Sequence, residues 1–198
     1  MRTGDVDILI VPGWSNSGPD HWQSRWARNL RTARRVEQAD WFAPDREAWV
    51  ETLIAEVDRS ARPAVLVGHS LGVATILHSA PKLGDGRVVG AFLVSPSDLD
   101  AVANWPCDAG QDWPSIVGSF APMPAAALPF PSRVICSSND PFCSIERAQA
   151  LGAIWGSDVS ILANAGHINA DSGQGPWPEG LLTFGLFLRN LGEPPRRH

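Results

Sequence analysis

The apolar residues of this chain fall into short runs separated by longer amphipathic segments. The runs at 8–11, 64–67 and 91–94 are continuously apolar, which is typical of parallel strands covered on both faces. Strands that alternate with helices predict right-handed crossovers and a mostly parallel α/β sheet of about six strands with helices on both faces. We expect strands at 7–11, 34–37, 64–67, 88–94, 133–136 and 159–162, and helices at 21–30, 46–60, 71–80, 145–155 and 179–191.

The sequence also predicts the capping residues of two helices and one irregular segment. Asp20 is expected to cap the helix at 21–30, and Ser144 the helix at 145–155. Residues 95–131 carry too many prolines for a long helix or a central strand, so we expect an irregular excursion near the edge or mouth of the sheet. The length of 198 residues predicts a single domain over 1–192. Residues 193–198 are expected to form a frayed terminus.

Composition narrows the class of protein. Hydrophobic residues make up 44%, and the net charge of −5 is spread along the chain without a basic stripe, so a nucleic-acid partner is not expected. No apolar run approaches the roughly 20 residues that span a bilayer, and the N-terminal apolar piece is too short for a signal peptide. These features predict a cytoplasmic protein with no membrane partner, and they do not indicate whether it has a protein partner. The three cysteines lack CxxC spacing and are expected to be free thiols, without a metal.

The stretch Gly68-His-Ser-Leu-Gly72 places a serine between an apolar strand and an apolar helix. This is the G-x-S-x-G pattern of a nucleophile elbow, in which a strained turn projects the serine hydroxyl and side chains at the two glycines would collide. The bare pattern is weak evidence, but a strand directly before it and a helix directly after it are its expected context. Ser70 is therefore the predicted nucleophile.

A serine hydroxyl needs a base beside it to become a good nucleophile. Of the five histidines, His167 follows the last predicted strand, and Gly166 gives its backbone freedom. His69 adjoins the serine, but its ring should project elsewhere around the turn. His78 lies two turns along the next helix and His198 lies in the tail, so His167 is the predicted base.

An acidic residue must orient the imidazole. Asp140 follows the predicted strand 133–136, and Pro141 suggests a defined turn after it. Asp98, which follows the strand 88–94, is the second candidate. The order Ser70, Asp140, His167 along the chain is that of α/β-hydrolases.

An acyl-transfer site also needs hydrogen-bond donors for the oxyanion. The amide of Leu71, next after the nucleophile, is one. The other should come from the loop after the first strand, where Pro12 has no N–H, so we expect the amide of Trp14, with Gly13 as the second choice. A plain tight turn is the alternative interpretation of this loop.

Aromatic and histidine side chains near the predicted site are pocket candidates, although ordinary packing is as good an interpretation of each one singly. The candidates are His21, Trp22, His69, Trp105, Trp113, Phe142 and Trp177.

Five segments together resemble one family of small serine hydrolases, that of retinoblastoma-binding protein 9 and bacterial YdeN. They are VPGWSNSGPDHWQSRW (11–26), RVEQADWFAPDREAWV (35–50), VLVGHSLG (65–72), SSNDPFCS (137–144) and GHINADSGQGPWPEG (166–180). The resemblance covers nearly the whole chain and is closest to the bacterial members. It implies a compact three-layer α/β-hydrolase fold without a large cap domain, a serine nucleophile and no cofactor. The animal members have a glycine-rich loop after the first strand, whereas this chain has Trp14 there, and we expect the indole to narrow the oxyanion side of the site.

These observations predict a serine hydrolase, and in particular a carboxylesterase that acts on a small ester through Ser70, His167 and Asp140. Thioesterase or amidase activity would use the same machinery and stays an alternative. A non-catalytic protein-binding role on a hydrolase scaffold is the alternative from another class, because a fold alone does not guarantee function.

Overall fold

Six parallel strands form the centre of the protein. The computed structural model describes residues 1–107 and 110–191, and in it the strands lie in the order β2-β1-β3-β4-β5-β6, with every neighbouring pair parallel. The predicted parallel α/β sheet is therefore confirmed. The strands are β1 (Asp7–Val11), β2 (Ala33–Arg35), β3 (Ala64–His69), β4 (Val88–Val94), β5 (Ser132–Ser137) and β6 (Asp158–Leu162).

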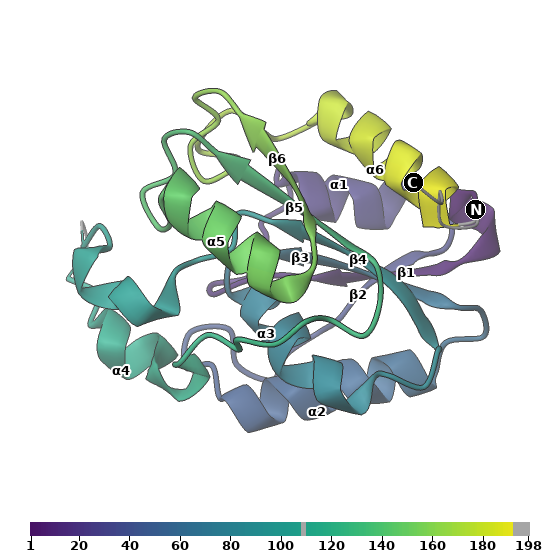
Figure 1. Cartoon of the computed structure of the whole chain (residues 1–198), viewed down its shortest axis with the longest axis horizontal. Coiled ribbons are helices and arrows are strands. Elements are labelled where there is room, and N and C mark those ends of the chain that lie inside the picture. The colour runs from purple at the N-terminus through teal and green to yellow at the C-terminus, as the bar shows by residue number, and fades with distance from the viewer. Residues whose placement is uncertain (108–109, 192–198) are drawn as a thin grey trace.

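Helices cover both faces of this sheet, so the fold has three layers (Figure 1). Successive strand residues point to opposite faces: Leu66 packs under one layer, and its neighbours Val65 and Val67 pack under the other. One layer contains α2 (Arg46–Asp58), α3 (Leu71–Ser79) and α5 (Ile145–Trp155), and the opposite layer contains α1 (Trp22–Asn29) and α6 (Pro178–Leu191). Because both faces are buried, the central strands are apolar at every position.

Two local predictions differ from the structure. The second strand was expected at 34–37 but spans Ala33–Arg35, a short edge strand whose residues are only half-buried. Asp20 does not cap α1. Instead, the ring of His21 accepts the N–H of Gln23 and caps this helix, while Asp20 pairs with Arg25. The predicted cap of α5 is confirmed, because the Ser144 hydroxyl accepts the N–H of Arg147.

The proline-rich segment 95–131 is folded into short helical pieces rather than being wholly irregular. Its described residues form 3-10 helices at Leu99–Asn104 and Gly118–Phe120, with α4 (Trp113–Val117) between them. Figure 1 shows α4 beyond the end of the sheet toward which the strand arrows point. No large cap domain is present in the described residues. Two more 3-10 turns lie at Thr3–Asp5 and Ala80–Lys82. The predicted frayed terminus at 193–198 lies outside the described residues.

Within the described part of the chain, none of the helices has the length and apolar character needed to cross a bilayer.

Candidate active site

Ser70 occupies a sharp turn between β3 and α3. Its backbone has φ 55° and ψ −126°, a region that non-glycine residues seldom adopt and that costs of order 1–3 kcal/mol. The N–H of Ser70 donates to the carbonyl of Val94 at 3.1 Å, which ties the turn to the end of β4. The side chain is half-buried and lines a cavity. This is the geometry expected of a nucleophile elbow.

Close contacts surround both glycines of the pattern, and at Gly72 the neighbouring atoms are fixed backbone. A Cβ atom at Gly68 would lie 2.7 Å from Cδ1 of Ile76. A Cβ atom at Gly72 would collide with the backbone carbonyls of Val11 and Pro12 at the end of β1. The first turn of α3 can therefore approach β1 only without a side chain at Gly72.

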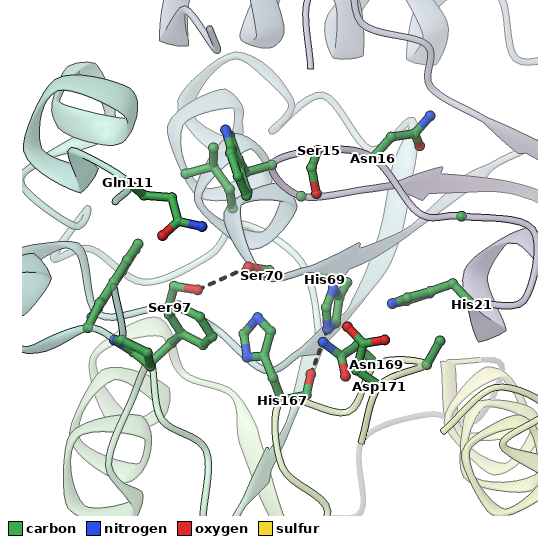
Figure 2. Close-up of a pocket in the computed structure, with 18 of the residues that line it drawn as sticks. Ser15, Asn16, His21, His69, Ser70, Ser97, Gln111, His167, Asn169 and Asp171 are labelled. Atoms are coloured by element: carbon green, nitrogen blue, oxygen red, sulfur yellow. Dashed lines mark hydrogen bonds between the residues drawn. The ribbon is translucent and has the colours of Figure 1, made fainter. Parts of the chain in front are cut away.

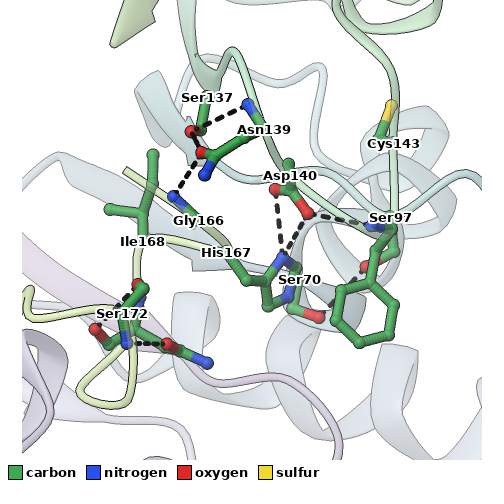
Figure 3. Close-up of polar contacts among 12 residues, drawn as sticks. Ser70, Ser97, Ser137, Asn139, Asp140, Cys143, Gly166, His167, Ile168 and Ser172 are labelled. Atoms are coloured by element: carbon green, nitrogen blue, oxygen red, sulfur yellow. Dashed lines mark hydrogen bonds and ion pairs between the residues drawn. The ribbon is translucent and has the colours of Figure 1, made fainter. Parts of the chain in front are cut away.

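His167 and Asp140, which come from different loops, are in direct contact. The Nδ1 atom of His167 lies 2.9 Å from Oδ1 and 3.0 Å from Oδ2 of Asp140 (Figure 3). The Asp140 side chain is 1% exposed, and its Oδ1 also accepts the N–H of Phe142 at 3.0 Å. An ionised carboxylate can only accept, so Nδ1 carries the proton and the lone pair of Nε2 is left for another partner.

The loop that carries His167 is held from β5. The hydroxyl of Ser137 accepts the N–H of Ala165 at 2.9 Å, and Oδ1 of Asn139 accepts the N–H of Gly166 at 2.8 Å. The Ser137 hydroxyl itself donates to Asn139. These bonds, drawn in part in Figure 3, hold the backbone just before the imidazole in place.

The other side of the same loop is held from β3 and α1. His69 donates its Nε2–H to the carbonyl of His167 at 2.8 Å, and the Trp22 indole donates to the carbonyl of Ile168 at 2.9 Å. Ile168 has φ 49°, an unusual value for a β-branched residue, so these contacts stabilise a strained backbone.

Ser97 is a residue that the sequence reasoning missed. Its hydroxyl lies 3.1 Å from that of Ser70 and is buried (Figure 2). Among the described residues, no hydrogen bond joins Ser70 to His167, although Figure 3 shows the His167 ring between Asp140 and Ser70. Ser97 follows β4 much as Ser70 follows β3, and that position at the carboxyl end of a strand is the signal that could have indicated it.

Asp98, the second candidate for the acid, has a different role. Its carboxylate pairs with Arg147 at 3.1 Å and accepts the N–H of Asp100. It makes no contact with His167 in the described structure.

The loop after β1 packs closely against the turn at Ser70, and Gly13 is the residue of closest approach. A Cβ atom at Gly13 would lie 2.9 Å from Cβ of Ser70 and 3.1 Å from the amide nitrogen of Leu71. The amide of Trp14 follows directly, and the Leu71 amide belongs to the first turn of α3, where N–H groups have no acceptor within the helix. The Trp14 indole donates to the carbonyl of Phe42 at 3.2 Å, which fixes its ring over the cavity.

Three imidazole rings form a row beside the elbow. The ring centroids of His21 and His69 are 4.9 Å apart, and those of His69 and His167 are 4.8 Å apart. Burial, reinforced by the neighbouring His167 and Arg35, lowers the pKa of His21 to about 4. Burial, with the adjacent His167 and His21, also lowers the pKa of His69 well below its ordinary value. Both rings are therefore neutral near pH 7.

The elbow, the His167 loop and the segment 95–131 enclose a cavity of about 480 Å³, within the range of small-molecule sites. The cavity is lined by the pocket candidates His21, His69, Trp105, Trp113 and Phe142. Trp22 and Trp177 do not line it. They pack with Trp26 in the core beneath α6, so their predicted pocket role is wrong: their large rings are buried against apolar neighbours. His78, partly buried in α3, bonds the carbonyl of Phe120.

Across residues 1–107 and 110–191, no group of three or more His, Cys, Asp or Glu side chains is arranged to hold a metal ion. Cys107, Cys136 and Cys143 are free thiols. Burial raises the pKa of Cys143 to about 12, so this thiol is not an alternative nucleophile near pH 7.

A three-layer parallel sheet with a serine elbow at the end of β3 defines an α/β-hydrolase. The model of the serine hydrolase family matches residues 8–185. A YdeN-like hydrolase from Pectobacterium atrosepticum is 30% identical, with a TM-score of 0.79 over 96% of this chain and 94% of its own. The ydeN product of B. subtilis is 20% identical, with a TM-score of 0.64 over 92% of this chain and 99% of its own. An esterase from Thermogutta terrifontis, 14% identical, has a TM-score of 0.64 over 95% and 91% of the two chains and shows the fold alone.

No curated protein matches the sequence. The family match covers most of the chain, and the Pectobacterium structure covers nearly all of it. The chain belongs to the YdeN-like serine hydrolase family, and the protein is a hydrolase.

Proposed function

We propose that the protein is a carboxylesterase that cleaves small esters through an acyl-enzyme formed on Ser70. The observation that carries the proposal is the 2.9 Å contact between His167 and the buried Asp140, beside the cavity that Ser70 and His167 line. This contact leaves the basic Nε2 of the imidazole free for the nucleophile.

In the proposed reaction, the hydroxyl oxygen of Ser70 attacks the ester carbonyl carbon while Nε2 of His167 takes its proton. The tetrahedral oxyanion accepts hydrogen bonds from the amides of Leu71 and Trp14. Its C–O bond to the alcohol then breaks, and the imidazolium returns the proton to the departing oxygen. Water attacks the acyl-enzyme with His167 again as the base, and the acid leaves as Ser70 recovers its proton.

The Ser70 hydroxyl must point its hydrogen at His167 for the first step. Ser97 is then the donor in the bond between the two serines, because Ser70 has only one hydrogen to give. A rotation about the Cα–Cβ bond of Ser70 aligns the hydroxyl between Ser97 and the imidazole.

The proposal is tested with a fluorophosphonate probe and p-nitrophenyl butyrate. Wild-type protein should be labelled and should hydrolyse the ester, and Ser70→Ala should lose both activities. Ser160→Ala, in the edge strand β6 and outside the cavity lining, is the matched control and should keep them. Labelling that survives Ser70→Ala contradicts the assignment, and a wild-type protein inert to both reagents favours a binding role.

The same side chains would serve a thioesterase or an amidase, so butyryl thioester and anilide substrates are assayed in parallel. Under the proposal the oxygen ester has the highest kcat/KM. A higher kcat/KM on the thioester or the anilide would transfer the assignment to that bond.

A further inference from the structure

The cavity around Ser70 has two chemically different halves. Figure 2 shows Ser97 and Gln111 on one side of Ser70, and Ser15, His21, Asn169 and Asp171 on the other. We call the first side, with the rings next to it, the aromatic half, and the second side the polar half.

The aromatic half is built from Trp105, Trp113 and Phe142. The Trp105 ring packs edge-on against both others, with centroids 5.6 Å from Trp113 and 5.3 Å from Phe142. Phe142 also contacts the ring of His167 at 4.5 Å, so this apolar wall reaches the reacting centre. It suits an apolar acyl group, which gains from leaving water.

The polar half presents N–H donors from two side chains. Nδ1 of His21 accepts the N–H of Gln23, so its neutral ring carries the proton on Nε2. The Oδ1 of Asn169 accepts the N–H of Ser172 at 2.9 Å, which leaves the amide hydrogens of Asn169 for a ligand. Ser15 adds a hydroxyl that Figure 2 shows turned toward the cavity.

Asp171 places a carboxylate beside these donors. It is exposed and has no hydrogen bond or ion pair within the described part of the chain. No lysine or arginine is found among the described residues that line the cavity, so Asp171 stays uncompensated there. A phosphate-bearing leaving group would meet this negative charge without a cation to offset it.

We propose that the natural substrate is an ester of an apolar acid with an uncharged polyhydroxy alcohol of the glycerol or sugar type, whose hydroxyls bind the polar half. This inference rests on the proposed esterase function. A hydroxyl group both donates and accepts, so it satisfies the Asp171 carboxylate and the His21 and Asn169 N–H groups together. A cationic alcohol would satisfy only the carboxylate and leave the N–H donors unpaired, which is unfavourable.

The test compares three hexanoyl esters and one hexanoyl thioester, which share the acyl group and differ in the leaving group. The probes are 1-monohexanoylglycerol, its di-O-methyl ether, hexanoylcholine and hexanoyl-coenzyme A. The ether keeps the carbon skeleton and the oxygen acceptors of the alcohol, is larger by two methyl groups and cannot donate hydrogen bonds. With wild-type protein, kcat/KM for the glycerol ester should exceed that for the ether by roughly tenfold, and it should be the highest of the four.

Asp171→Asn tests the contribution of the carboxylate. It should reduce the glycerol-to-ether ratio from roughly tenfold to about twofold. A neutral amide oxygen accepts a hydrogen bond more weakly than a carboxylate, and the amide NH2 group cannot accept one from a substrate hydroxyl. Glu179→Gln, an equal change of charge at the exposed start of α6, should keep the wild-type ratio. The rate of fluorophosphonate labelling checks that each variant is folded and that Ser70 is reactive.

Three results overturn the inference: equal rates on the glycerol ester and its ether, a preference for the choline ester or the coenzyme A thioester, or an unchanged ratio in Asp171→Asn. A failure of the serine-hydrolase mechanism itself looks different, because Ser70 would then not be labelled and none of the four substrates would be cleaved. Labelling of Ser70 with cleavage of the coenzyme A thioester alone would instead show that the oxygen-ester assignment fails.

Discussion

The hydroxyl of Ser97 lies 3.1 Å from the hydroxyl of Ser70, so the predicted nucleophile has a hydrogen-bond partner in the resting protein. If Ser97 donates, it orients the Ser70 hydrogen toward His167. Ser97→Ala should then slow fluorophosphonate labelling by roughly 3- to 10-fold, the equivalent of one neutral hydrogen bond. Ser97→Thr, which keeps the hydroxyl, should recover most of the rate. Unchanged or faster labelling in Ser97→Ala would show that Ser97 does not assist the nucleophile.

Asp140 contacts His167, whereas Asp98 pairs with Arg147, so substitutions of the two carboxylates should have different effects on activity. Asp140→Asn should lower kcat on p-nitrophenyl butyrate by about 10³- to 10⁴-fold, because an amide stabilises the wrong tautomer of His167. The matched variant Asp98→Asn removes a carboxylate that pairs with Arg147 and should keep kcat within a few-fold of wild type. A larger loss from the Asp98 change than from the Asp140 change would reverse the assignment.

Gly72 should be essential to the fold as well as to the elbow. Gly72→Ala should lower the free energy of unfolding by about 3 kcal/mol or more, because the added methyl group collides with backbone at the end of β1. Urea denaturation followed by tryptophan fluorescence measures this change. Gly185→Ala in α6, where a Cβ meets nothing within 4 Å, should instead raise it by about 0.5–1 kcal/mol.

Stability should fall in mild acid because of the buried imidazoles. His21 has a pKa of about 4 in the folded protein and about 6.5 when unfolded, so the unfolded chain binds more protons between these values. Its contribution is therefore fully present above pH 6.5 and is lost as the pH falls toward 4, by about 3 kcal/mol.

His21→Asn keeps a side-chain cap for α1 but removes the titration, so its stability should vary less between pH 7 and pH 4.5. Thermal unfolding across that range measures the difference. If the unfolding temperatures of wild type and His21→Asn fell in parallel with pH, titration of His21 would be excluded as a cause of the acid destabilisation.

Much of the sheet was predictable because its central strands carry an unambiguous pattern. The strand at Asp7–Val11 and the helix at Ile145–Trp155 have the predicted bounds. The edge strand Ala33–Arg35 does not, since a half-buried strand lacks a continuous apolar run. The cap at His21 was missed because histidine is not among the usual capping residues, whereas Asp20 beside it is.

Predicting side-chain direction from the sequence was harder. Sequence order and strand ends indicated the candidates at 70, 140 and 167, but they did not show that Trp22 faces the core while His21, one residue earlier, faces the cavity. The sequence alone does not single out Ser97, because its neighbour Asp98 at the same strand end carries the carboxylate that a triad requires. Contacts across the sheet, not local pattern, decide these cases.

The hydrogen bonds from Trp22 and His69 hold the His167 loop in place in the absence of substrate. They hold two consecutive carbonyls of that loop, and Ser137 and Asn139 hold the two preceding amides. The imidazole is thus preorganised during folding, and its orientation does not have to be selected anew at each turnover.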